Sequence, residues 1–246
     1  MEETLTPEAA ASLLQAIANG DGIEESISTQ TLLALAEMAL DLERMEICER
    51  LALSGHSKAI KEENMEAGAW ALFLIARVKL TDALQRIEEA HLEEEIVHLD
   101  AGLLGALQDA RIAAEDLNDL RLIGNIDQLE GIHYRAIGDV LRAKDAFVRS
   151  LGSKKSTGDT LGAANSLHSL GEVSMDQAEF EDALGFFDQA AEIYESVDEM
   201  LECAHAMSLS SHVLIQLNRL DEAKTRLQNS LEIGRTIEDS STQIVA

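Results

Sequence analysis

The sequence predicts an all-α protein built as a solenoid of antiparallel helical hairpins, on three observations. First, 46% of the 246 residues are hydrophobic but only 3% are aromatic, and there is one proline, which favours helices throughout. Second, the apolar residues of 180–194 recur at i, i+3, i+4 and i+7, which places one apolar stripe on a helix. Third, the pattern returns about every 40 residues, a period typical of helical repeats.

The repeat shows in matching positions about 40 residues apart. Alanine stands at 143, 183 and 223, and a large apolar residue at 147, 187 and 227. Carboxylates at 119, 159, 199 and 239 precede a first helix, where they stabilise the positive end of the helix dipole. We expect a repeat array over 61–246, clearest in 121–160, 161–200 and 201–240 and truncated at its C-terminus.

The first 60 residues are less regular. Thr6-Pro7-Glu8 predicts a helix start, with a hydroxyl cap and a proline in the first turn, and the glycines of 19–22 predict its end near Asn19. A second helical region is predicted over 29–53, and Ser54-Gly55-His56-Ser57 is interpreted as the next break. We expect residues 1–60 to form an irregular N-terminal cap or degenerate repeats.

From residue 61 the predicted helices follow one another with short turns. They span 61–78, 81–97, 100–117, 120–136, 139–153, 160–176, 179–195, 199–216 and 219–236, and a further helix is expected after Asp239. Residues 81–97 fit two roles. The alanines and apolar residues at 83, 84, 87 and 90 have the spacing of a second helix, whereas the period makes the segment a first helix.

Charge and composition exclude several function classes. The net charge of −27 disfavours binding to nucleic acids and to anionic membranes and allows a basic partner, although acidic residues also simply solvate outer helix faces. The start of the chain does not resemble a signal peptide, and the longest apolar run, 67–76, is too short to span a membrane. Cys48 and Cys203 form no recognisable disulfide framework, so we expect a reducing cytoplasm.

No arrangement of residues predicts catalysis or a cofactor. Phosphate-binding loops and nucleophilic triads are not recognisable, and Cys203 and His205 do not face each other because they are two residues apart on a helix. His91, Glu95 and His98 fall on one helix face, but the run of glutamates around them is better explained as a solvated surface than as a metal site. We therefore expect no enzyme, no metal and no cofactor.

The repeat unit resembles the tetratricopeptide repeat (TPR), most clearly over 121–240. Leu170-Gly171 matches the Leu-Gly of the family's first helix, and Ala183, Phe187 and Ala190 match the small, aromatic and small positions of its second helix. Leu167 replaces the usual tryptophan, the closing proline is missing, and the period exceeds the usual ~34 residues. In these respects the unit looks like the long-period variants of kinesin light chains and bacterial regulators.

The resemblance implies a right-handed superhelix in which first helices line a concave groove. The groove positions that it assigns are the following: Asn125, Gln128, Ile132, Arg135, Asn165, His168, Glu172, Met175, His205, Ser208 and His212. The same positions fit equally well with ordinary residues on a helix surface. The lysine and asparagine pattern by which some TPR domains grip a C-terminal carboxylate is not present.

Three hypotheses on function remain open. The first is a regulatory module that binds a protein or peptide segment, as in TPR-like parts of bacterial signalling proteins, some of which precede an output domain such as a diguanylate cyclase. The second is a self-associating scaffold, a homodimer through the C-terminal hairpin or the Trp70 helix. The apolar faces of 67–74 around Trp70 also fit a central helix that is packed on two sides. The third is a sensor for a small ligand or peptide held by His168, His205 and His212.

Overall fold

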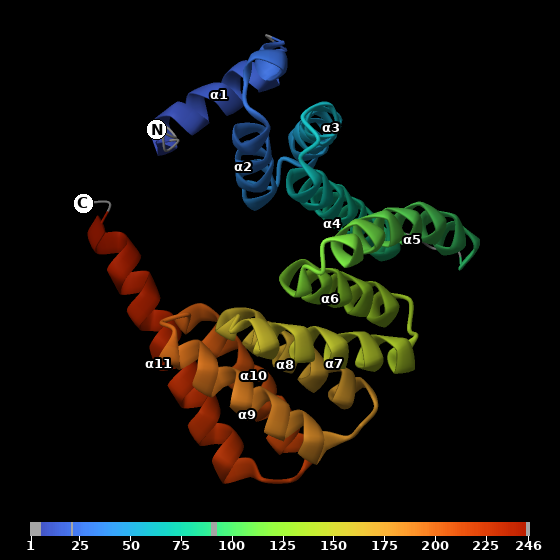
Figure 1. Cartoon of the computed structure of the whole chain (residues 1–246). Helices are drawn as coiled ribbons and strands as arrows, with labels where there is room; N and C mark the ends of the chain where they lie inside the picture. The colour runs from blue at the N-terminus through green and yellow to red at the C-terminus, as the bar shows by residue number, and fades with distance from the viewer. Residues whose placement is uncertain (1–5, 21, 90–92, 245–246) are drawn as a thin grey trace. The chain divides into compact units, whose positions relative to one another are not determined.

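The structure, a computed structural model, describes residues 6–20, 22–89 and 93–244. These residues contain helices and turns and no β-strand (Figure 1). The chain divides into two compact units, 1–129 and 130–246, with the boundary inside helix α6 (Leu120–Ala136). None of the described helices is both long enough and apolar enough to cross a membrane.

The first unit begins with α1 (Pro7–Asn19), whose cap Thr6 accepts a hydrogen bond from the backbone N–H of Ala9, as the sequence predicts. A short 3₁₀ helix, η1 (Ile23–Ser26), follows. The next elements are α2 (Thr29–Asp41), α3 (Met45–Lys61), α4 (Met65–Glu89) and α5 (Glu93–Asp116). Consecutive helices from α2 to α5 pack against each other as antiparallel neighbours, and short turns join α2 to α3 and α3 to α4.

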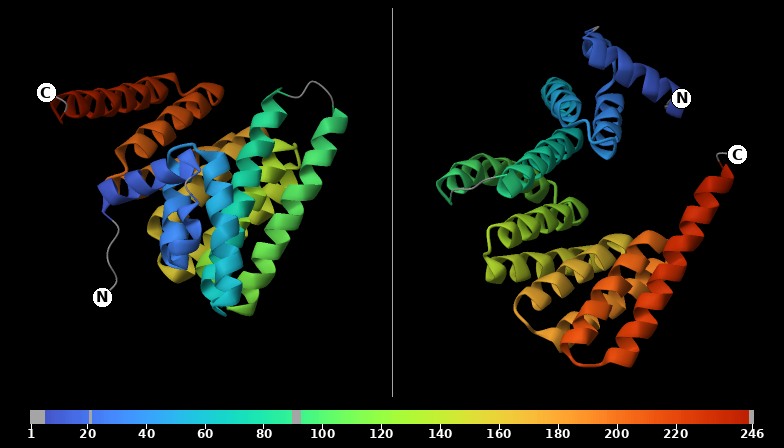
Figure 2. Two further views of the ribbon diagram at one scale, coloured as in Figure 1. Left: turned by 90° about the horizontal axis from the view of Figure 1, so that it is seen from above. Right: turned by 180° about the vertical axis from the view of Figure 1, so that it is seen from behind.

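The second unit consists of the end of α6 and five further helices. These are α7 (Val140–Thr157), α8 (Thr160–Asp176), α9 (Phe180–Ser196), α10 (Met200–Gln216) and α11 (Leu220–Ile244). Helices α7 to α11 pack in chain order, and α10 and α11 lie side by side in all the views of Figures 1 and 2. The prediction of an all-α array of antiparallel hairpins is confirmed.

Several helix boundaries were predicted wrongly in the first unit, including the break between 97 and 100, which lies inside α5. The break expected at 54–57 lies inside α3, and the chain turns instead around Glu43, whose φ is 56°. Gly55 lies where α3 packs closely on α2, because a Cβ at this position would be 2.7 Å from the side chain of Leu33. The helices expected at 61–78 and 81–97 are also wrong as separate elements, since residues 65–89 form the single helix α4. Thr81 lies inside that helix, and its hydroxyl donates a hydrogen bond to the carbonyl of Arg77, at 3.2 Å.

The last helix is also longer than predicted. A break and a new helix were expected after Asp239, but α11 runs without interruption to Ile244. The acidic pair at 238–239 does not end the helix because neither glycine nor proline accompanies it.

Carboxylates cap some of the repeated helices. Asp159 accepts a hydrogen bond from the N–H of Gly162, and Asp119 accepts from the N–H groups of Arg121 and Leu122. Glu199 precedes α10 without a side-chain hydrogen bond to the helix end. The longer glutamate side chain leaves only the dipole interaction there.

Helix α4 is the central helix of the first unit. Ala69, Ala71 and Leu74 are buried, and α4 packs against α2, α3 and α5. The indole N–H of Trp70 donates a hydrogen bond to Glu37 of α2. These contacts agree with the interpretation of a helix packed on two sides. Cys48 and Cys203 are buried free thiols, and burial raises the pKa of each.

The core of the second unit is built on a repeated contact between glycine and phenylalanine. Phe187 of α9 is fully buried against Gly171 of α8, and Phe147 of α7 meets Gly131 of α6 in the same way. A Cβ on Gly171 would lie 2.7 Å from the Phe187 ring. The absence of a side chain therefore sets how closely the two helices of a hairpin approach.

This contact gives a stability prediction. Gly171→Ala forces the Phe187 ring out of a close-packed site, so we expect a loss of roughly 1–3 kcal/mol in the free energy of unfolding. Gly185→Ala is the matched control, because Gly185 is also inside a helix but has no atom within 4 Å of an added Cβ. It should gain about 0.5–1 kcal/mol from helix propensity. Urea unfolding of both variants measures the two changes, and equal effects of the same sign would contradict the role of the contact.

Candidate functional site

In the unit of residues 130–246, polar side chains from α6, α8 and α10 meet along one row. Arg135 of α6 forms ion pairs with two carboxylates of α8, Glu172 at 2.9 Å and Asp176 at 2.7 Å. His168, one turn before Glu172 on α8, stacks on His205 of α10, with ring centroids 5.1 Å apart. The row therefore joins three first helices through side-chain contacts.

The ion pairs are only partly accessible to water. Burial by itself lowers the pKa of Arg135, but the hydrogen bond to Asp176 and the charges of Glu172 and Asp176 outweigh it and raise that pKa. Burial raises the pKa of Glu172, and the charge of Arg135 opposes this effect. Arg135 thus stays charged at neutral pH and holds two carboxylates beside it.

His168 is held as a neutral imidazole. Burial, followed by the charges of His205 and Arg135, lowers its pKa from 6.5 to about 4. Its ring meets the edge of Phe187 at 5.5 Å between centroids, and its Nδ1 atom has no hydrogen-bond partner among the described residues. His205, by contrast, is exposed. The pair presents one accessible imidazole supported by one enclosed imidazole.

A buried tyrosine fixes the second helix behind the row. Tyr194 of α9 is 3% exposed, and its hydroxyl donates a hydrogen bond to Asn165 Oδ1 of α8 at 2.7 Å. Burial, with the nearby carboxylates Glu202, Glu172 and Glu199, raises the pKa of Tyr194 far above its usual range. The phenol therefore remains a neutral donor and orients the exposed Asn165.

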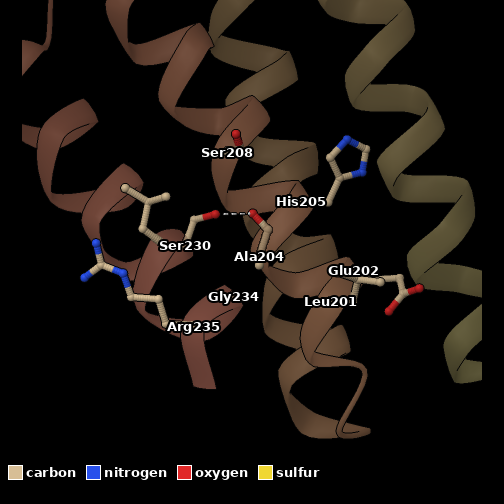
Figure 3. Close-up of a pocket in the computed structure, with 9 residues that line it drawn as sticks. Leu201, Glu202, Ala204, His205, Ser208, Ser230, Gly234 and Arg235 are labelled. Atoms are coloured by element: carbon tan, nitrogen blue, oxygen red, sulfur yellow. Dashed lines mark hydrogen bonds between the residues drawn. The ribbon is translucent and has the colours of Figure 1, made fainter. Parts of the chain in front are cut away.

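An open concavity of about 700 Å³ adjoins His205, between α10 and α11. In Figure 3, His205 and Glu202 extend from α10 on one side and Arg235 extends from α11 on the other. The Ser230 hydroxyl donates to the carbonyl of Ala204 at 2.7 Å and closes the floor. The lining residues are Leu201, Glu202, Ala204, His205, Ser208, Ser230, Leu231, Gly234 and Arg235.

The structure brings together only part of the predicted groove set. Arg135, Asn165, His168, Glu172 and His205 contact one another or a shared neighbour, and Ser208 lines the concavity with His205.

The other predicted positions are placed differently. Ile132 and Met175 pack against apolar clusters around Phe147 and Phe187, and His212 is exposed on α10. Asn125 and Gln128 belong to the unit of residues 1–129.

Sequence reasoning missed four members of the site, Asp176, Tyr194, Glu202 and Arg235. Asp176 was placed at the end of the helix predicted over 160–176 and Tyr194 in the apolar stripe of 180–194, whereas Glu202 and Arg235 were not singled out. A signal existed for Tyr194, because a tyrosine in an apolar stripe needs a hydrogen-bond partner for its hydroxyl. The described residues hold no group of three side chains placed to bind a metal ion, and the cluster of His91, Glu95 and His98 lies outside the described side chains.

The depressed pKa of His168 gives a pH prediction. The unfolded chain protonates this histidine near pH 6.5 but the folded chain only near pH 4, so the neutral side chain stabilises the fold fully above pH 6.5 and this stability is lost as the pH falls toward 4. His168→Gln cannot take up that proton. Between pH 7 and pH 4.5 we expect the wild type to lose roughly 2 kcal/mol more unfolding free energy than the variant. Parallel pH profiles of the two proteins would contradict the assignment.

Part of the second unit matches a known repeat family. The profile of the tetratricopeptide repeat family matches residues 163–197, which hold most of α8, all of α9 and the turn between them. No protein of curated function matches the sequence.

Solved structures share the fold at low sequence identity. The apo form of RapI aligns with a TM-score of 0.63 and 14% identity, over 94% of this chain and 92% of that chain. BtubC (BKLC) from P. vanneervenii aligns with a TM-score of 0.68 and 12% identity, over 94% and 87%. A Rap protein complexed with Competence and Sporulation Factor gives a TM-score of 0.64 at 12% identity, over 92% and 70%. With its repeated hairpins and the matched repeat at 163–197, the chain is a TPR-like helical-repeat protein.

Proposed function

We propose that the chain is a non-catalytic regulatory module that binds a protein or peptide segment along the row of Arg135, Glu172, His168 and His205. The observation that carries this proposal is the meeting of three first helices in one continuous row of polar side chains. Each helix is fixed by the core beneath it, so the row is formed before a partner arrives. A preformed surface lowers the ordering cost of binding.

The row offers hydrogen-bonding groups at different depths. Asn165 and His205 are exposed, whereas His168 and Glu172 are half-buried and supported by Tyr194, Phe187 and Arg135. An extended segment that lies across α8 and α10 meets an amide, an imidazole and a carboxylate in succession. Such side chains recognise the backbone and polar groups of a peptide and contain no nucleophile placed beside a general base.

The charge of the row favours a basic segment. The three carboxylates Glu172, Asp176 and Glu202 outnumber the two guanidinium groups Arg135 and Arg235, and His168 is neutral. The whole chain carries a formal charge of −27, which attracts a cationic partner and accelerates its approach.

The comparisons supply an analogy for the ligand. One structure of similar fold is a Rap protein complexed with Competence and Sporulation Factor. By this analogy we extend peptide binding and a role in bacterial signalling to the present chain, where binding would act on an output domain of the same protein or of a partner. The two buried, unpaired cysteines fit the reducing cytoplasm in which we place it.

The test is peptide selection on the intact chain. A random peptide library displayed on phage should yield binders enriched in lysine and arginine, and fluorescence polarisation of synthetic peptides then gives their affinities. We expect His205→Ala and Glu202→Gln each to weaken binding about tenfold, which corresponds to about 1.4 kcal/mol. Raising the salt concentration should weaken binding as well.

Glu192→Gln is the matched control. Glu192 is an exposed carboxylate of α9, and it takes no part in the contacts of the row. Its replacement should leave peptide affinity unchanged while removing the same charge as Glu202→Gln. Equal losses in Glu192→Gln and Glu202→Gln would show only a general charge effect and would refute the proposed site, as would a selection that yields no binder above scrambled peptides.

A further inference from the structure

Helix α11 carries an uncovered row of leucines in the described part of the second unit. Leu220, Leu227 and Leu231 are 58%, 40% and 54% exposed, and they follow one another at i, i+7 and i+11 on one face of the helix. One period earlier, at 187 and 191, the equivalent residues Phe187 and Ala191 are 0% and 6% exposed. The same face is therefore closed on α9 and open on α11.

What closes the face of α9 is the next first helix. Cys203 and Ala206 of α10 pack in one apolar cluster with Ala164 of α8 and with Ala191 and Tyr194 of α9. Shifted by about 40 residues, these last three positions are Ala204, Leu231 and Gly234, and all three line the concavity between α10 and α11. The concavity thus repeats a surface that, one hairpin earlier, is covered by helix α10.

The open face is held rigidly. Arg226 of α11 pairs with Asp188 of α9 and donates to Ser210 of α10 at 3.0 Å, and Ser230 donates to the carbonyl of Ala204. The face presented by α10 and α11 is therefore preformed, which lowers the entropic cost of covering it.

Charge identifies the occupant. Residues 200–237 contain four acidic residues (Glu202, Asp221, Glu222, Glu232) and four basic residues (Arg219, Lys224, Arg226, Arg235). With Glu238 and Asp239 of α11, the hairpin has a formal charge of only −2 in a chain of −27. Two copies of so acidic a chain repel each other over most of their surface. The face of α10 and α11 is apolar and neutral, and it carries Glu202 on one side and Arg235 on the other.

We infer that this face, formed by Leu201, Ala204, Leu227, Leu231 and Gly234, is the surface through which two copies of the chain form a homodimer. A two-fold axis across the face brings α11 of each copy onto the open concavity of the other and lets Arg235 approach Glu202 of the second copy. The same surface patch then serves both partners, and the association closes at two copies. Glu202 and His205 line the same concavity, so a dimer closed over it and a peptide that reaches these two residues exclude each other.

Light scattering coupled to size-exclusion chromatography of the full chain tests the inference. At micromolar concentration the mass should be twice 26.8 kDa and should fall toward one chain on dilution. Leu231→Glu places a charge in the centre of the face and should raise the dissociation constant of the dimer at least about tenfold. Higher salt should strengthen the wild-type dimer by screening the repulsion between the two acidic chains.

Leu141→Glu is the control variant. Leu141 is 72% exposed on α7, outside the open face, so the same substitution should leave the dimer intact. Circular dichroism checks that both variants remain folded. A wild-type chain that is monomeric at every concentration overturns the inference, and so does a dimer that survives Leu231→Glu or is lost equally in both variants. A monomer that still binds peptides would refute the dimer and leave the proposed function standing.

Discussion

The second unit depends on the contact between a glycine of one helix and a phenylalanine of the next. Gly171 lets the ring of Phe187 lie directly against the backbone of α8, and Gly131 does the same for Phe147. The close approach buries the whole phenylalanine ring between the two helices of the hairpin. His168, one turn before Glu172, meets the edge of the same phenylalanine ring, and α10 and α6 supply the partners of His168 and Glu172. The core and the row are therefore joined through the same phenylalanine ring.

The half-buried polar groups of the row are paired with one another. Arg135 satisfies two carboxylates that half-burial would otherwise destabilise, and the neutral state of His168 avoids a second positive charge beside Arg135. The Tyr194 hydroxyl can remain buried because it donates a hydrogen bond to Asn165 Oδ1. Each of these interactions joins different helices, so the row also contributes to the register between hairpins. The side chains of this surface therefore lose little conformational entropy when a partner segment binds.

Charge is distributed unevenly along the chain, and this has a physical consequence. The acidic residues outnumber the basic residues by 27 in the whole sequence, but the hairpin of α10 and α11 has a formal charge of only −2. Acidic helix faces keep most of the surface solvated and oppose contact between copies. A neutral face with exposed leucines lacks that protection, and an uncovered apolar surface of this kind is typical of an interaction site.

The sequence by itself determined the fold class, the period of the array and the core of 120–236, because apolar spacing and small residues act within one helix or one hairpin. It placed Arg135, His168, Glu172 and His205 on first helices. It did not predict that His168 contacts His205 or that Arg135 forms ion pairs with Glu172 and Asp176. It also predicted breaks at 54–57, near 80 and after 239 where the structure has helix. A glycine or a polar cluster looks the same in the sequence whether it ends a helix or lets a neighbouring helix pack closely. Gly55 does the latter, because it makes room for the side chain of Leu33. Only the packing between helices decides which of the two occurs, since the contacts responsible join residues about 20 to 40 positions apart.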